Sequence, residues 1–91
     1  MSKDKRYTAI RSMVETGILS GFKEIFDIIP KTLVSNDLGM NYQTFTRKVN
    51  EPDLFTLREL AKIAHLMAVK PMTLVELILK DLERRGRKSS R

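Results

Sequence analysis

The chain contains no cysteine and no tryptophan, and its longest unbroken apolar runs are only a few residues long. The absence of cysteine excludes disulfides and thiolate metal sites. Apolar runs of this length are far too short to span a membrane. Met1 is followed by charged residues, without the apolar segment of a secretory signal. We therefore expect a cytoplasmic protein without a membrane partner.

Acidic residues are scarce at one end of the chain, so the basic charge is unevenly distributed. The formal net charge is +6, and five of the basic residues lie in the segment 84–91, which contains no acid. Residues 1–83 therefore carry a net charge of only +1. A basic balance favours polyanionic partners, but its distribution matters more than its size. Bulk charge alone does not establish nucleic-acid binding here, and a functional interpretation has to rest on the residue pattern.

Apolar residues recur at three- and four-residue spacing along most of the chain, which predicts an all-α protein. Ninety-one residues suffice for one domain with a small core. The expected helices cover Lys3–Thr16, Phe22–Ile29, Lys31–Leu38, Tyr42–Val49, Thr56–Met67 and Leu74–Arg84.

Capping signals mark several of these helix ends. Gly17 and Gly39 can end helices in a left-handed conformation. Asn41 can cap the helix that follows it. Thr56 begins a predicted capping box with Glu59, and the same signals recur at Thr73 and Glu76.

The segment 31–50 has the pattern of two short helices joined by a tight turn at Gly39. Apolar residues on both sides of the turn can hold the two helices at a steep angle. The small side chain of Ser35 suits the point of closest approach. Five residues are expected on the outward surface of the second helix: Asn41, Tyr42, Gln43, Thr46 and Arg47. No acid interrupts this surface between Asn41 and Asn50, and glutamine and arginine can bind adenine and guanine bidentately.

The segment 31–78, from KTLVSND to LVELI, resembles the lambda-repressor/Cro-like helix-turn-helix family, and the resemblance covers roughly residues 22–84. It implies a five-helix domain whose third helix enters the major groove of DNA. It further implies phosphate contacts from Lys31 and Thr32. The residues that would contact bases are Asn41, Tyr42, Gln43, Thr46 and Arg47, and Lys48 is assigned to a phosphate. Lys48 departs from the family pattern, which usually has an apolar residue there, and Val49 is expected to pack in its place.

These observations predict three segments in the chain. Residues 1–20 form an amphipathic N-terminal helix that the family does not account for. Residues 21–84 form the helix-turn-helix DNA-binding domain, and residues 85–91 form a basic, disordered tail. The predicted function is sequence-specific binding of double-stranded DNA by a small repressor-like transcriptional regulator.

A small core and spare apolar residues predict a homodimer. Val75 and Leu79 lie off the inward stripe of the last helix and are candidates for the interface, with the helix Lys3–Thr16 as the competing candidate. The alternative function is a protein-interaction module, an antitoxin-like partner protein on the same scaffold. His65 is the only histidine and the acids are scattered, so we expect no enzyme, no metal and no cofactor.

Overall fold

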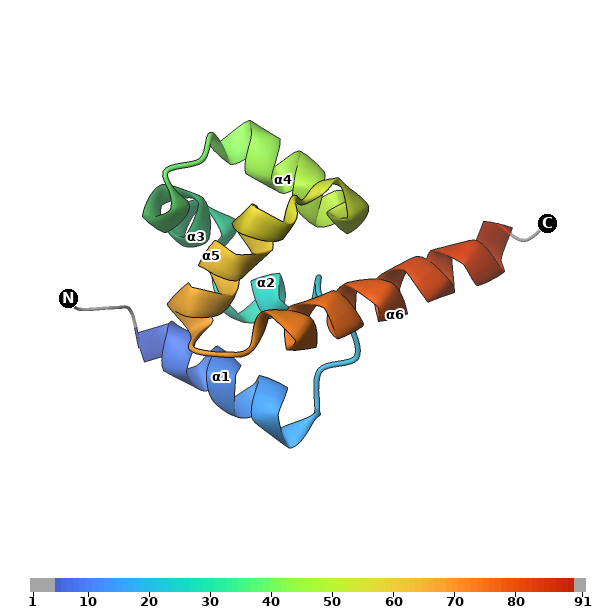
Figure 1. Ribbon diagram of the computed structural model, residues 1–91, viewed down its shortest axis with the longest axis horizontal. Helices are drawn as coiled ribbons and strands as arrows, with labels where there is room; N and C mark the ends of the chain where they lie inside the picture. Colours follow the sequence, from blue (N-terminus) through green and yellow to red (C-terminus); the bar gives the residue numbers. More distant parts are fainter. Residues whose placement is uncertain (1–4, 90–91) are drawn as a thin grey trace.

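Helices form every regular element of the described chain, which confirms the all-α prediction. The structure is a computed structural model that describes the backbone of residues 5–89 and the side chains of residues 5–84. The elements are α1 (Lys5–Thr16), α2 (Ile25–Ile28), α3 (Lys31–Leu38), α4 (Tyr42–Asn50), the 3-10 helix η1 (Pro52–Leu54), α5 (Leu57–Met67) and α6 (Pro71–Ser89). In Figure 1, α5 lies between α1 on one side and the α3–α4 pair on the other, and α6 extends away from the body.

Helix α1 belongs to the same hydrophobic core as the rest of the chain. Its side chains Tyr7 and Ile10 are buried in that core. The Tyr7 hydroxyl also donates a hydrogen bond of 2.8 Å to Oδ2 of Asp37 in α3. Gly17 ends the helix with a φ of +74°, the left-handed conformation that the sequence predicts. The segment predicted as an N-terminal extension is therefore part of the folded body.

The second helix is shorter than predicted, because the residues before it form successive turns with hydrogen bonds between residues three apart. Oδ2 of Asp81 in α6 accepts hydrogen bonds from the backbone amides of Phe22 (3.0 Å) and Lys23 (3.1 Å). Amides at the start of a helical turn have no acceptor within it, so the Asp81 carboxylate caps the turn that precedes α2 (Ile25–Ile28). A proline follows Ile29, whose backbone is extended (φ −123°, ψ 133°), and this ends α2 as expected.

All four phenylalanines of the chain form one closed group in the core. Phe22 contacts Phe26 and Phe55 edge to face, with ring centroids 5.5 and 5.6 Å apart. Phe45 contacts the same two rings at 5.5 Å (Phe26) and 5.9 Å (Phe55). Edge-to-face packing is the favoured geometry of aromatic pairs. The phenylalanine quartet joins the segment around α2, helix α4 and the residue that precedes the N-cap of α5.

The start of α5 follows the sequence-based prediction, whereas the start of α6 does not. Thr56 and Glu59 form the predicted capping box, in which each side chain accepts from the other residue's backbone amide. The predicted box at Thr73 is wrong, because α6 begins at Pro71 and Thr73 lies within its first turn. Proline suits the first helical position, since its fixed φ matches the helix and its missing amide hydrogen is not needed there.

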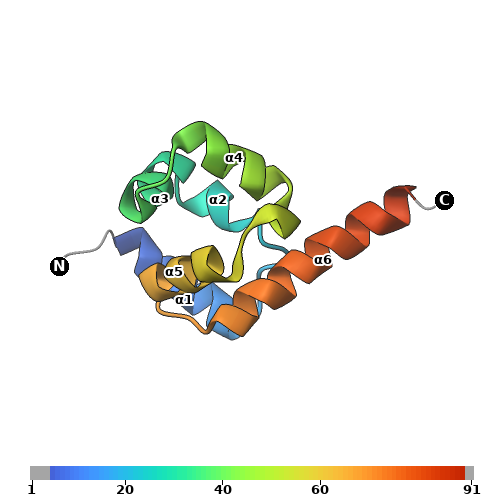
Figure 2. The same ribbon diagram turned by 45° about the horizontal axis from the view of Figure 1, so that its top comes forward.

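Helix α6 continues beyond its predicted end near Arg84. Its backbone is helical to Ser89, so the structure shows helix where the sequence predicted the beginning of a disordered tail. Gly86 is the one poor helix former in this stretch, and neighbouring arginine and lysine are good ones. The prediction of disorder for residues 90–91 lies outside the described residues. Figure 2 shows the C-terminal half of α6 clear of the other helices.

Candidate nucleic-acid interface

The turn between α3 and α4 is short and closed by backbone hydrogen bonds. Gly39 has a φ of +71°, as predicted, and the amide of Met40 donates to the carbonyl of Ser35 at 2.9 Å. This bond, which spans five residues, is typical of a helix that ends at a left-handed glycine. Ser35 itself is almost completely buried, as its predicted place near the second helix requires. The turn therefore brings the C-terminal end of α3 and the start of α4 together.

Asn41 caps α4, as the sequence predicts. Its Oδ1 accepts hydrogen bonds from the amides of Gln43 (2.9 Å) and Thr44 (3.1 Å). On the inner face of the helix, Phe45 is completely buried in the quartet and Val49 is buried beside the core. Because these contacts fix the inner face, the rotation of α4 about its axis is determined.

The outward face of α4 is polar and contains one cation. Gln43, Thr44, Arg47 and Asn50 are all exposed, and they lie opposite the buried pair of apolar residues. Four of the five predicted base-contacting residues are exposed: Asn41, Tyr42, Gln43 and Arg47. Thr44 and Asn50 are not among the residues predicted from the sequence, although their helical spacing from Gln43 and Arg47 is a sufficient signal.

Thr46 does not lie on this outward face. It is half-buried, and its Oγ1 is buried without a hydrogen-bond partner among the described residues. One residue after the buried Phe45, its side chain is turned toward the flank of α4 rather than toward solvent. The outward-facing residues of α4 therefore include Thr44 and not Thr46.

Lys48 forms an ion pair within the protein. Its Nζ lies 2.8 Å from both carboxylate oxygens of Glu59 in α5, and both side chains are largely buried. Burial raises the pKa of Glu59, but hydrogen bonds from Lys48 and Thr56 outweigh it, so that the pKa lies below its ordinary value. The pair holds α4 against α5, and a lysine engaged in this way is unsuited to the phosphate contact predicted for Lys48.

The predicted phosphate contacts at the start of α3 have different degrees of exposure. Lys31 is half-buried and Thr32 is exposed. The N-cap residue is Pro30, whose side chain offers no capping hydrogen bond. Amides at an uncapped helix start attract anions, because they point outward with the positive end of the helix dipole. At the other end of the motif, exposed Glu51 and Asp53 directly follow α4.

The two predicted interface residues on α6 lie on one side of the helix. Val75 is half-buried and Leu79 is exposed. They continue a stripe that also contains exposed Met72 and half-buried Leu82, at positions spaced as in a heptad repeat. This stripe, the α6 stripe, runs along the flank of the helix, where Val75 and Leu82 also pack against the edge of the core and Met72 and Leu79 are exposed.

A cluster around Asp81, which the sequence analysis missed, holds α6 in place. Its Oδ1 lies 2.7 Å from Nη2 of Arg84, which also donates to the carbonyl of Ser20 at 3.1 Å. Gly21 is buried beneath this pair, and a Cβ there would overlap both Asp81 Oδ1 and Arg84 Nη2. No local pattern could have signalled a contact between residues 59 positions apart in the chain.

Among the described residues, no group of three or more histidine, cysteine or acidic side chains is placed to hold a metal ion. None of the helices in the same part of the chain is both long and apolar enough to cross a membrane. No protein-family model matches the chain, and no curated protein or solved structure is significantly similar to it.

Proposed function

We propose that the protein binds duplex DNA sequence-specifically, with α3 and α4 as a helix-turn-helix, and acts as a small transcriptional regulator. One observation carries the proposal: a polar, acid-free face on a helix whose opposite face is locked into the core. On this proposal, the domain is a lambda-repressor-like fold in which α4 is the recognition helix, as the sequence resemblance implies. A helix of this kind lies in the major groove with its first residues among the bases.

The chemistry of the exposed face supports base recognition. Gln43 and Arg47 are four residues apart, so both project from the same side of α4. A glutamine amide can form two hydrogen bonds with adenine, and an arginine guanidinium can do the same with guanine. Asn41 and Tyr42 flank them at the helix start, and Thr44 takes the place proposed from sequence for Thr46. In this arrangement Gln43, one turn nearer the start of α4, lies deeper in the groove than Arg47.

Phosphate contacts are proposed for Lys31 and Thr32 at the uncapped start of α3. Lys48 leaves this set because its ammonium is paired with Glu59. The acids Glu51 and Asp53 at the C-terminal end of α4 would repel the DNA backbone. The DNA is therefore expected to lie nearer the N-terminal ends of both helices.

The α6 stripe supports a homodimer. Met72 and Leu79 are 63% and 52% exposed, and with the half-buried Val75 between them they form a continuous apolar strip that a second copy could cover. Pairing two copies through this stripe would cover Val75 and Leu79 and would present two recognition helices to one site. A symmetric dimer would then bind half-sites about one helical turn, ~34 Å, apart.

Selection of bound duplexes from a random DNA library tests the proposal directly. We expect an enriched palindromic motif, and Gln43→Ala should remove about 1–3 kcal/mol of discrimination at one base pair while nonspecific affinity stays nearly unchanged. Lys31→Ala should weaken binding to all sequences and make the log–log salt slope shallower by roughly one unit. Lys80→Ala, an exposed lysine on α6, is the matched control and should change neither. Failure to enrich any motif at low salt would refute sequence-specific binding.

A second candidate function is that of an antitoxin-like partner protein. Apolar side chains that DNA would leave uncovered favour it, most clearly Leu57 at the start of α5, which is 79% exposed. A protein partner would bury such side chains. Two results together would support this candidate. The parent chain would enrich no DNA duplex, and the Leu57→Ser variant would lose binding to a protein partner that the parent chain binds.

A further inference from the structure

A groove runs along the outer face of α5, where three hollows adjoin. The largest, of about 470 Å³, lies between α3 and α5. It shares Leu38 and Lys62 with a hollow of about 270 Å³ beside the α3–α4 turn. It shares His65 and Leu66 with a hollow of about 140 Å³ against α1. We call the whole the α5 groove.

The floor of the α5 groove is apolar. Leu38 and Leu66 are half-buried and rest on the hydrophobic core, and Ala61 between them is exposed. The small side chain of Ala61 leaves the centre of the hollow open. An apolar ligand surface could thus pack on side chains whose positions are already fixed by the core.

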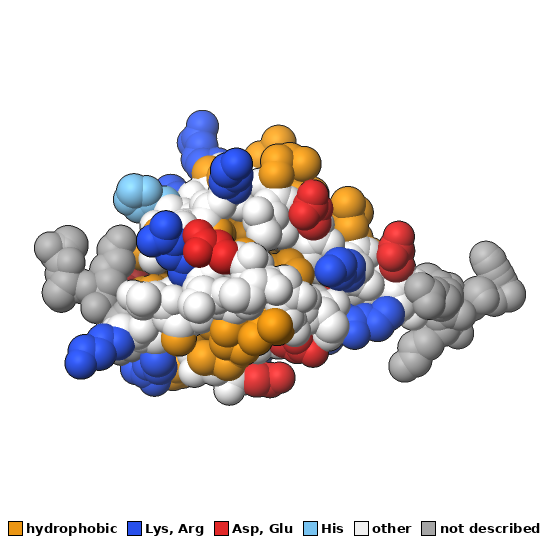
Figure 3. Space-filling view, turned by 90° about the horizontal axis from the view of Figure 1, so that it is seen from below, with side chains coloured by type: hydrophobic (Ala, Val, Ile, Leu, Met, Phe, Trp, Pro, Cys, Tyr) orange, Lys and Arg blue, Asp and Glu red, His pale blue; other side chains and the backbone are white. Residues whose placement is uncertain are grey.

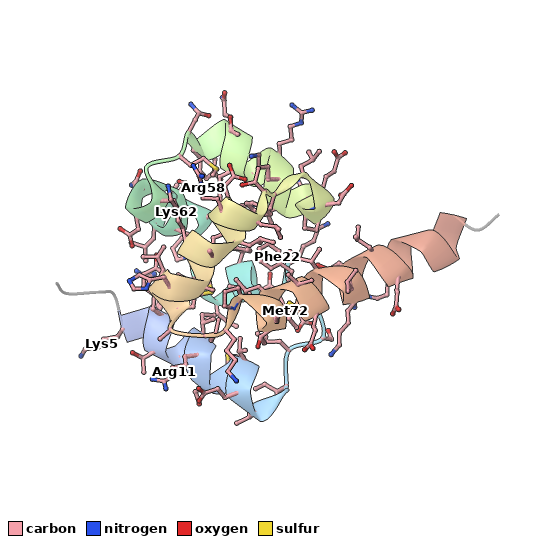
Figure 4. All side chains as sticks on the ribbon, viewed as in Figure 1. Lys5, Arg11, Phe22, Arg58, Lys62 and Met72 are labelled. Atoms are coloured by element: carbon pink, nitrogen blue, oxygen red, sulfur yellow. The ribbon has the colours of Figure 1, made fainter. Side chains whose placement is uncertain are left out.

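The rim of the α5 groove is basic. Arg58 and Lys62 lie one helical turn apart on α5, and neither forms an ion pair with a described residue. Figure 4 shows both on the part of α5 that lies beside α3. In Figure 3 the histidine, pale blue, lies beside basic side chains at one edge of the molecule. Since His65 also lines the groove, the rim can present three nitrogen-bearing side chains to one ligand.

Two acids line the α5 groove, and only Glu59 is neutralised by an ion pair with a described residue. Both carboxylate oxygens of Glu59 accept hydrogen bonds from Nζ of Lys48. Asp37 accepts the hydrogen bond of the Tyr7 hydroxyl. Asp37 keeps its charge, because a hydroxyl is neutral. Among the described residues, the groove thus has two unpaired cations, Arg58 and Lys62, against one unpaired carboxylate, and the ligand it favours is acidic.

The shape of the α5 groove favours a peptide over a duplex. An α-helix of the length of α5 is about 16 Å long at 1.5 Å per residue, which matches about five residues of an extended strand or three turns of a helix. A duplex is a broad convex cylinder that would touch the rim but leave the apolar floor uncovered. The groove also adjoins the C-terminal end of α3, whereas the proposed phosphate contact Lys31 lies at its N-terminal end.

We propose that the α5 groove binds a short acidic segment of a partner protein, whose apolar side chains pack on Leu38, Ala61 and Leu66 while its carboxylates pair with Arg58 and Lys62. This binding is independent of DNA recognition by α4. It follows the general mode in which an amphipathic segment lays its apolar face into a groove and charges at the edge set its orientation.

A random peptide library displayed on phage, panned against the full chain, tests the proposal. We expect enriched peptides that combine aspartate or glutamate with large apolar residues. Fluorescence anisotropy of one enriched peptide should show binding that weakens about tenfold or more in the double variant Arg58→Glu/Lys62→Glu, because two surface attractions become repulsions. The matched control Lys5→Glu/Lys80→Glu has the same net charge and should bind within about twofold of the parent chain.

A third variant tests the floor without altering charge. Ala61→Phe fills the central hollow from an exposed position, so it should abolish binding while circular dichroism shows an unchanged helical fold. Enrichment of peptides without acids, or equal weakening by both charge variants, would overturn the proposal. It would equally be overturned if a short DNA duplex, rather than the peptide, shifted the amide resonances of Leu38 and Ala61.

Discussion

Replacing Phe45 by alanine separates the buried face of α4 from its exposed face. The ring is completely buried and makes two edge-to-face contacts, with Phe26 and Phe55. Truncation of a buried phenylalanine costs about 3–5 kcal/mol, of which each lost aromatic pair contributes about 0.5–1.5 kcal/mol. A domain of this size has a total stability of about 5–15 kcal/mol. Phe45→Ala should therefore lower the melting temperature by at least ~12 °C.

Urea unfolding followed by far-ultraviolet circular dichroism measures this loss. Thr44→Ala is the control, since it alters the neighbouring but exposed position and should change stability by no more than about 0.5 kcal/mol. In a double-mutant cycle, Phe45→Ala and Phe55→Ala should be non-additive, because both remove rings from the same quartet. A cost below about 1 kcal/mol for Phe45→Ala would refute the orientation of α4, and the proposed base contacts would fail with it.

Three further changes test other parts of the structure. Ala68 ends α5 with a φ of 56°, where glycine is less strained, so Ala68→Gly should raise stability by about 1 kcal/mol in thermal unfolding. Gly21→Ala should lower stability by about 1–3 kcal/mol, because its Cβ would overlap the carboxylate of Asp81; an unchanged urea midpoint would contradict this packing. Since the pKa of Glu59 is lowered from 4.5 in the folded state, its contribution is present above that pH and lost as the pH falls through the folded value. Glu59→Gln or Lys48→Met should therefore flatten the acid limb of the stability curve measured against pH.

Local signals in the sequence predicted the ends of several helices, because these ends depend on neighbouring residues. Gly17 and Gly39 adopt the left-handed backbone that ends a helix, and Asn41 caps α4 with its own side chain. The capping box of Thr56 and Glu59 spans only three residues and forms as predicted. Apolar periodicity likewise predicted the all-α class and the buried face of α4, since helical geometry alone places residues four apart on one side.

Contacts between distant segments were decided only by the tertiary structure. The carboxylate of Asp81 caps the turn that precedes α2, and nothing near Phe22 in the sequence indicates that partner. Lys48 is a cationic side chain of the kind that contacts phosphates. It pairs with Glu59 instead, because the packing of α4 against α5 brings the two charges together and largely out of water. The sequence alone determines the chemistry of each side chain and its spacing from near neighbours. The partner of a charged group depends instead on which helices pack together and on how far that packing excludes water.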